Sequence, residues 1–219
     1  MFEGHPFRDA PVRKLPSARI KPKVSRFARF AGIGIVALIW NVLVGLQLAS
    51  ALSLGPVSAI VLASLFMIVG LMILGAAVHA LLAIFNPDVE VLASVGQPAL
   101  GEPLELRWRL AGKSSRVRRL QIDLEGTEEA TYTHGTDTVT DRQRFEYIAV
   151  TATADPAEIA EGTATIVIPA GAVPSFYAKN NKIVWRIVVK GEIHHWPDID
   201  DEFLVEVIPH RRVRVTVAA

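Results

Sequence analysis

The sequence contains no cysteine among its 219 residues. The protein therefore has no disulfide framework, no thiolate metal site and no cysteine nucleophile. Motifs of other catalytic centres are also missing, because G-x-S-x-G, H-E-x-x-H and G-x-G-x-x-G do not occur. Gly112-Lys-Ser resembles the end of a phosphate-binding loop, but Arg107 stands where that loop needs glycine, and no helix pattern follows. The sequence thus offers no catalytic constellation.

Charge is absent from residues 31–85, which include no Asp, Glu, Lys or Arg. Two apolar stretches, about 31–54 and 57–85, flank Gly55-Pro56 within this segment. About 20 apolar residues at a rise of ~1.5 Å cross a hydrocarbon core of ~30 Å, so each stretch is long enough to span a membrane. Proline lacks an N–H donor and clashes with the preceding turn, so we expect a break at Pro56. The segment predicts a transmembrane helical hairpin rather than two buried helices of a soluble core.

The charged residues on either side of this hairpin are distributed unevenly. Residues 1–30 carry eight Lys or Arg and two acids, whereas residues 86–219 carry 15 basic and 20 acidic side chains. The polar lead is too long for a cleaved signal peptide, and a second span follows at once. Because basic flanks stay in the cytoplasm, we expect both termini there. The basic side chains of residues 8–29 also suit anionic lipid headgroups.

Small or polar residues recur along both predicted spans. The first span repeats every four residues and the second every seven, at Ala37, Asn41, Gly45, Ala49 and Ser53 and at Ala63, Gly70 and Ala77. Small residues let helix backbones approach closely in lipid. Either the two spans pack on each other, or a stripe also docks another membrane protein. His79 lies at membrane depth, but neither span supplies a second histidine for haem, so we expect a local hydrogen bond or a position near the interface.

After Asn86 the hydrophobic period changes from 3.6 to 2. In residues 103–110, for example, apolar side chains alternate with charged ones. Strict alternation is typical of strands with one buried and one wet face. The strand-like runs are 88–95, 103–110, 120–126, 142–152, 161–168, 182–190, 202–208 and 212–217. About eight strands separated by turn residues predict an all-β antiparallel sandwich in residues 86–219.

The stretch 194–203, HHWPDIDDEF, concentrates candidate ligands. His194, His195, Asp198 and Asp200 are the candidate metal ligands. Adjacent strand residues point to opposite faces, however, so both histidines reach one ion only if the chain turns there. We favour a turn between two strands, with Pro197 ending the first of them. No cofactor is expected, and the stretch instead offers a contact patch formed by Trp196, Asp198, Asp200, Asp201 and Glu202.

Five arginines in the sandwich raise the question of nucleic acid: Arg107, Arg109, Arg116, Arg118 and Arg119. The region is net acidic and has no aromatic stacking motif, so we expect no nucleic-acid partner. A solvated or headgroup-facing surface suits these side chains better.

Several segments carry a resemblance to a known family. LGEPLELRWRL, LEGTEEATY, EGTATIVIPAGAVPSF, NKIVWRIVVKGEI and WPDIDDEFLVEVIP occur in this order within residues 88–210. They resemble the C-terminal sandwich of bacterial two-span membrane proteins with a domain of unknown function. The resemblance implies an arrestin-like or immunoglobulin-like sandwich and a bacterial cytoplasmic membrane, but no activity. Members of that family carry an extra domain between the spans, where this chain has only Gly55-Pro56.

The sequence therefore predicts three parts: a basic cytoplasmic tail (1–30), a transmembrane hairpin (31–85) and a cytoplasmic sandwich (86–219). We expect a non-enzymatic, multi-pass interaction module that acts as an adaptor or accessory subunit for another membrane protein. Two alternatives stay open. One is a metal-binding sensor or hydrolase that uses the 194–202 cluster, and the other is a sensor of anionic lipid that uses the basic tail.

Overall fold

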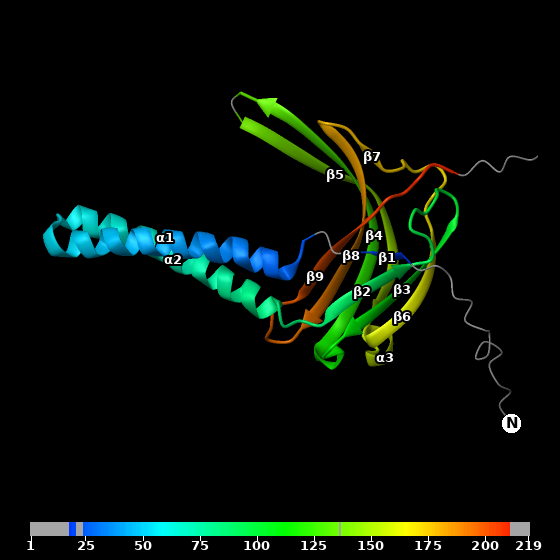
Figure 1. Cartoon of the computed structure of the whole chain (residues 1–219), viewed down its shortest axis with the longest axis horizontal. Helices are drawn as coiled ribbons and strands as arrows, with labels where there is room; N and C mark the ends of the chain where they lie inside the picture. Colours follow the sequence, from blue (N-terminus) through cyan, green and yellow to red (C-terminus); the bar gives the residue numbers. More distant parts are fainter. Residues whose placement is uncertain (1–17, 21–23, 136, 211–219) are drawn as a thin grey trace, which may run out of the picture.

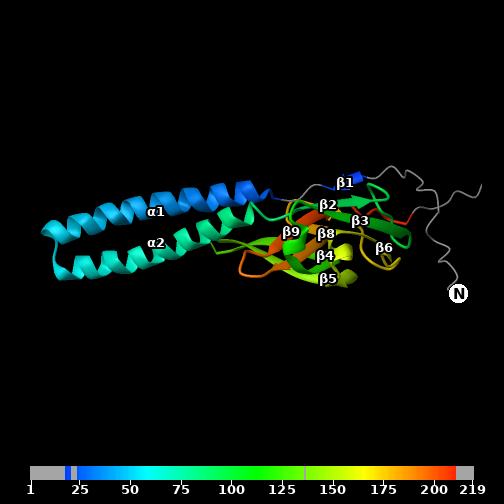
Figure 2. The ribbon, with the colours of Figure 1, turned by 90° about the horizontal axis from the view of Figure 1, so that it is seen from below.

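The structure is a computed structural model that describes residues 18–20, 24–135 and 137–210. Two views at right angles show a long helical hairpin that projects from one side of a β-sandwich (Figure 1, Figure 2). In chain order the elements are β1 (Ala18–Ile20), α1 (Arg26–Leu54), α2 (Val57–Ala83), β2 (Asp88–Ala93), β3 (Pro103–Ala111), η1 (Ser114–Arg116), β4 (Val117–His134), β5 (Asp137–Thr153), α3 (Pro156–Ala160), β6 (Glu161–Val167), β7 (Phe176–Tyr177), β8 (Asn181–Ile193) and β9 (Ile199–Val205).

Local chemistry sets both ends of α1. Ser25 caps its N-terminus, because the Ser25 Oγ accepts a hydrogen bond from the Ala28 N–H at 3.1 Å. At the other end, the Gly55 N–H donates to the Ala51 carbonyl at 2.9 Å. A Cβ at Gly55 would lie 2.8 Å from the Ala51 backbone, so the turn requires glycine. The helix therefore begins before the predicted span and ends at the predicted Gly-Pro break.

The two helices pack on each other through small side chains. The buried residues of α1 are Ala37, Val44 and Ala51, and those of α2 include Ala63, Gly70 and Ala77. Both sets repeat every seven residues, which drifts only about 20° around a helix, so the seam stays between the helices. A four-residue step drifts about 40°. The predicted stripe therefore starts in the seam at buried Ala37 and leaves it at exposed Ala49.

Both helices are long and apolar enough to cross a membrane. Their 29 and 27 residues correspond to about 43 and 40 Å of helix. Only 17% of the most apolar window of α1, and 11% of that of α2, is buried. Most of their apolar side chains therefore point outward.

The remaining strands form two antiparallel sheets. Sheet A has the order β1-β2-β3-β6, and sheet B has the order β5-β4-β8-β7, with β9 also paired to β8. The inward faces meet in one core that contains Trp108 from β3 and Trp185 from β8, exposed by 4% and 0%. Each indole N–H is satisfied, Trp108 by the Glu158 carbonyl and Trp185 by the Val173 carbonyl, both at 2.9 Å. This confirms the predicted fold class of two apolar helices followed by antiparallel sheets.

Three features differ from the sequence-based prediction. β1 lies inside the segment predicted as a tail, and it pairs with β2 at the edge of sheet A. Strands β4 and β5 are longer than predicted and form a ribbon that extends beyond the rest of sheet B (Figure 1). Between β5 and β6, where no helix was predicted from the hydrophobic pattern, the chain forms a short helix, α3, capped by the Asp155 carboxylate. The predicted strand 212–217 lies outside the described residues.

Candidate functional site

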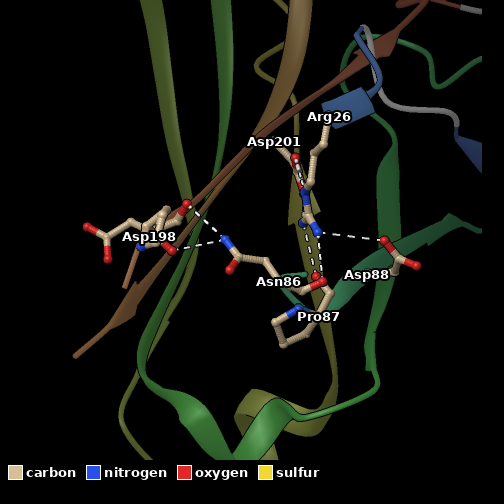
Figure 3. Close-up of polar contacts among 7 residues, drawn as sticks. Arg26, Asn86, Pro87, Asp88, Asp198 and Asp201 are labelled. Carbon is tan, nitrogen blue, oxygen red and sulfur yellow. Dashed lines mark hydrogen bonds and ion pairs between the residues drawn. The ribbon is translucent and has the colours of Figure 1, made fainter. Parts of the chain in front are cut away.

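Arg26 forms the centre of a polar cluster where the helices meet the sandwich (Figure 3). Its guanidinium donates to the Asp201 carboxylate at 2.6 and 3.4 Å, to the Asn86 carbonyl at 2.9 Å and to the Pro87 carbonyl at 3.0 Å. Asp88 lies 3.6 Å away. The side chains of Arg26 and Asp201 are only 14% and 11% exposed, so solvent screens this pair weakly. The planar guanidinium of arginine, with its fork of N–H donors, fits this arrangement of acceptors, whereas the ammonium group of a lysine does not.

The Arg26 contacts join parts of the molecule that are far apart in sequence. Arg26 is the first residue of α1, Asn86 and Pro87 lead from α2 into β2 of sheet A, and Asp201 lies on β9 of sheet B. One side chain therefore links the base of the hairpin to both sheets. This arrangement fixes the orientation of the sandwich relative to the helices.

Asn86 makes a second link at the end of the hairpin. It is 6% exposed, and its side-chain amide donates to the Pro197 carbonyl at 2.9 Å and to the Asp198 carbonyl at 3.2 Å. Figure 3 shows the Asn86 side chain directed at the Asp198 segment, while the Arg26 contacts fan out to Asp201, the carbonyls and Asp88. The turn 194–198 is thus attached directly to the end of the second helix.

The candidate metal ligands lie in this turn between β8 and β9. His195 has a φ of 53°, so the chain turns sharply there, and its ring centroid is 3.6 Å from that of His194. The Asp198 carboxylate accepts from the Ile193 N–H at 2.9 Å and caps the turn, while Asp200 lies beyond it on β9. Within residues 18–20, 24–135 and 137–210, no group of three or more His, Cys, Asp or Glu side chains is arranged to hold a metal ion.

Most of the predicted acidic contact patch takes part in the fold itself. Asp198 caps the turn, and Asp201 binds Arg26. Glu202 lies 3.5 Å from Arg186, a buried β8 arginine that also binds Glu129. The Asp200 side chain is exposed and makes no hydrogen bond or ion pair with any described residue. Of these acids, Asp200 is therefore the one most available to a partner.

Trp196, the aromatic member of the same patch, packs against the core. The Arg116 guanidinium stacks over its ring, 4.5 Å from the centroid. A cation over an indole face is a favourable contact. This places the β3–β4 connection beside the turn 194–198.

The predicted helix stripe divides between the seam and the exterior. The Asn41 amide donates to the Ala37 carbonyl at 2.8 Å and to the Gly70 carbonyl of α2 at 3.0 Å. A Cβ on Gly70 would lie 2.6 Å from Asn41 Oδ1, so glycine makes this contact between the helices possible. Gly45 is half-buried near Met67 of α2, whereas Ala49 is exposed. Ala37 and Asn41 hold the hairpin together, and His79 is exposed on α2.

A second polar group lies on the outer face of sheet B. Asp123 is 3% exposed, and it accepts hydrogen bonds from the Tyr147 hydroxyl and the Gln121 amide, both at 2.8 Å. The hydrogen bond to the Asp123 carboxylate raises the pKa of Tyr147 above its ordinary value. These contacts connect β4 to β5 and stiffen the base of the ribbon.

The sequence pattern did not identify Arg26 or Asn86 as site residues. Arg26 belonged to a basic tail whose expected roles were orientation and lipid contact, and Asn86 only marked the change of hydrophobic period. The one available signal was charge complementarity between a basic helix start and the acidic stretch 198–202. The pairing of Arg26 with Asp201 spans 175 positions, which local pattern cannot predict.

No family model matches the chain, and no curated protein matches it. Among solved structures, the chain is similar to Spo0M, a sporulation control protein from Bacillus subtilis, with 14% sequence identity and a TM-score of 0.39. The match covers 57% of this chain and 50% of Spo0M, so the chain spans half the length of that protein. The fold assignment rests on the strand order and the shared core, and membership of the two-span family stays a prediction.

Proposed function

We propose that the protein is a membrane-anchored, non-enzymatic interaction module. In this proposal α1 and α2 cross the bacterial cytoplasmic membrane as a hairpin, and the sandwich lies at the cytoplasmic surface as an adaptor or accessory subunit. The observation that carries the proposal is the combination of outward-facing apolar helices with the Arg26 junction, which fixes the sandwich to the base of the hairpin.

The exposed surface of the hairpin supports the membrane setting. Large apolar side chains such as Leu38, Leu46 and Leu65 are 66%, 66% and 56% exposed, and they lie on all sides of the helices away from the seam. Contiguous apolar surface of this extent is unstable in water, whereas hydrocarbon solvates it well. Among the described elements, none packs extensively on α1 or α2 apart from the other helix of the hairpin.

The orientation follows from charge. Arg26 and Arg29 lie at the start of α1, whereas residues 31–85, which include the turn between the two helices, carry no charged side chain. Basic residues near a span stay in the cytoplasm. Because α2 returns the chain to the side on which α1 began, the sandwich lies on that side too.

The Arg26 junction supports a positioning role rather than a chemical one. Its charged and polar groups are engaged with one another in a nearly closed network, with Arg26 held by four partners. A fixed junction of this kind presents the same face of the sandwich to any neighbour in the membrane. Asp200, which is exposed next to the junction, is the predicted point of contact.

A photo-crosslinking amino acid at Asp200 tests the adaptor role in intact membranes. We expect a stoichiometric crosslink to one membrane protein from this position, and none from the matched position Val95 in the connection between β2 and β3. Failure to crosslink at Asp200, together with a purified lone monomer in mild detergent, would contradict the adaptor role.

A further inference from the structure

We propose that the connection between β3 and β4 binds the headgroups of anionic lipids beside the hairpin. We name residues 112–119, which comprise this connection and the first three residues of β4, the basic loop. The inference rests on the proposed membrane anchoring and adds to it a lipid-binding surface outside the N-terminal tail.

Both ends of the basic loop adjoin the junction. Ala111, just before it, pairs directly with Asp88 of β2, and Asp88 lies 3.6 Å from Arg26. Arg116 stacks over Trp196, whose neighbour Pro197 accepts a hydrogen bond from Asn86 at the end of α2. The loop therefore lies beside the points where both helices enter the sandwich, on the side that faces the membrane surface.

The apolar surface of the hairpin reaches the same level. Phe27 in the first turn of α1 and Phe85 just after α2 are each 67% exposed. Because the apolar surface extends to both helix ends, the hydrocarbon boundary lies close to the junction. The polar headgroup layer then lies at the level of the basic loop.

The charge of the basic loop has one sign. Lys113, Arg116, Arg118 and Arg119 fall between Leu110 and Gln121, with no acid among them. Lys113, Arg118 and Arg119 are exposed. Lys113 and Arg118 make no hydrogen bond or ion pair through their side chains with any described residue. Long basic side chains with free charge are what an anionic surface attracts.

A bulge at the start of β4 gives Arg118 its freedom. The pairing of β4 with β8 skips from Val117 to Arg119, so Arg118 has no residue opposite it. Arg119, by contrast, pairs directly with Glu192, and both line a groove with Lys190, Asp198 and Asp200. The acidic side chains of this groove compensate the positive charge of Arg119. Lys113 and Arg118 are therefore the side chains that bind lipid in this proposal.

The full chain in lipid nanodiscs provides the test, because the sequence has no cysteine and a single introduced cysteine can be labelled. A polarity-sensitive fluorophore on Ser115→Cys reports on the loop, and one on Val95→Cys serves as the distant control. Discs of phosphatidylcholine alone are compared with discs containing one third phosphatidylglycerol, at low and high salt.

We expect a blue shift of the Ser115→Cys label only in anionic discs, lost at high salt and absent from the Val95→Cys label. Replacing Lys113 and Arg118 by Gln should lower the bound-to-free ratio of the loop about 25-fold, since each charge near an anionic surface contributes about fivefold. Lys179→Gln with Lys182→Gln should leave the shift unchanged, because these two exposed lysines lie just before and within the far end of β8.

An equal signal in both kinds of disc, or a shift that survives in the Lys113/Arg118 variant, would overturn this inference while leaving membrane anchoring intact. A protein that does not enter discs of either composition would overturn the anchoring proposal itself, and the lipid contact with it.

Discussion

At the scale of the residue, Arg26 has the most consequential position in the molecule. It stands immediately after the Ser25 cap, where helical geometry directs it back toward the sandwich. Its guanidinium donates to the backbone carbonyls of Asn86 and Pro87, which follow α2, and to the Asp201 carboxylate of β9. Loss of the guanidinium would leave Asp201 charged and nearly buried without its partner, which is far more costly than loss of an exposed ion pair.

Replacing Arg26 by Ala should therefore destabilise the protein by about 3 kcal/mol. Arg26→Lys should recover only part of this loss, because an ammonium cannot span the carboxylate and both carbonyls. Thermal unfolding in detergent, followed by tryptophan fluorescence, measures the change. In the Arg26→Ala variant, the backbone amides of β9 should exchange their hydrogens faster than in the unchanged protein, because local opening begins there.

Arg29 provides the matched control. It lies one turn further along α1, is exposed, and has no ion pair to a described residue, so Arg29→Ala should shift stability by less than about 0.5 kcal/mol. Equal melting temperatures for Arg26→Ala and the unchanged protein would show that the junction contributes nothing to stability.

At the scale of the element, the pairing of β3 with β6 depends on one close approach. Trp108 of β3 lies directly opposite Gly162 of β6, and a Cβ on Gly162 would overlap the Trp108 ring. The indole thus lies flat across the neighbouring strand and donates to the Glu158 carbonyl of α3. The short helix, the edge strand and the core are fixed together by this side chain.

Gly162→Ala should lower the free energy of unfolding by about 1–3 kcal/mol, because the Trp108 ring must leave its place in a packed core. Gly171→Ala is the control, since a Cβ there meets no atom within 4 Å. Chemical denaturation followed by tryptophan fluorescence compares the two. An effect of Gly162→Ala no larger than that of Gly171→Ala would contradict the packing described for β3 and β6.

Among the described residues, the elements that follow from local pattern were predicted correctly, and those that depend on distant pairing were not. Alternation in 103–110 predicted β3, and the lack of charge in 31–85 predicted both helices. The strand β1 has only three residues within a basic segment, and it exists because β2 offers an open edge. Beyond Ala130, where β4 no longer pairs with β8, the ribbon is held mainly by cross-strand pairs of β4 and β5, such as Thr131 with Thr140, which no apolar alternation marks.

The same distinction applies to the candidate site. A turn between two strands was correctly predicted within the stretch 194–203, because Pro197 is a local signal, but it is confined to residues 194–198, and Asp200, Asp201 and Glu202 lie on β9. Its contacts were not predictable, since Asp201 meets Arg26 and Asn86 meets Pro197 only after the sandwich has closed. A four-residue stripe overstated the helix contact surface, because the seam follows the seven-residue repeat of Ala37, Val44 and Ala51.

At the scale of the whole molecule, the arrangement is an apolar arm fixed to a two-sheet body (Figure 2). The arm carries no formal charge between residues 31 and 85, and the body carries the acidic excess. The Arg26 and Asn86 contacts place the junction, the basic loop and Asp200 at one level. Under the proposed function, this shape places one face of the sandwich next to the membrane, where lipid headgroups and membrane proteins are its expected neighbours.

Labelling of single cysteines in intact and permeabilised bacterial cells tests the central claim most directly. With an impermeant maleimide, Ser58→Cys beside the Gly55-Pro56 turn should react in intact cells, whereas Ser115→Cys in the basic loop should react only after permeabilisation. Both variants should remain in the membrane fraction after alkaline extraction. Reaction of Ser115→Cys in intact cells, or release of the protein by alkali, would contradict a hairpin that crosses the membrane and holds the sandwich in the cytoplasm.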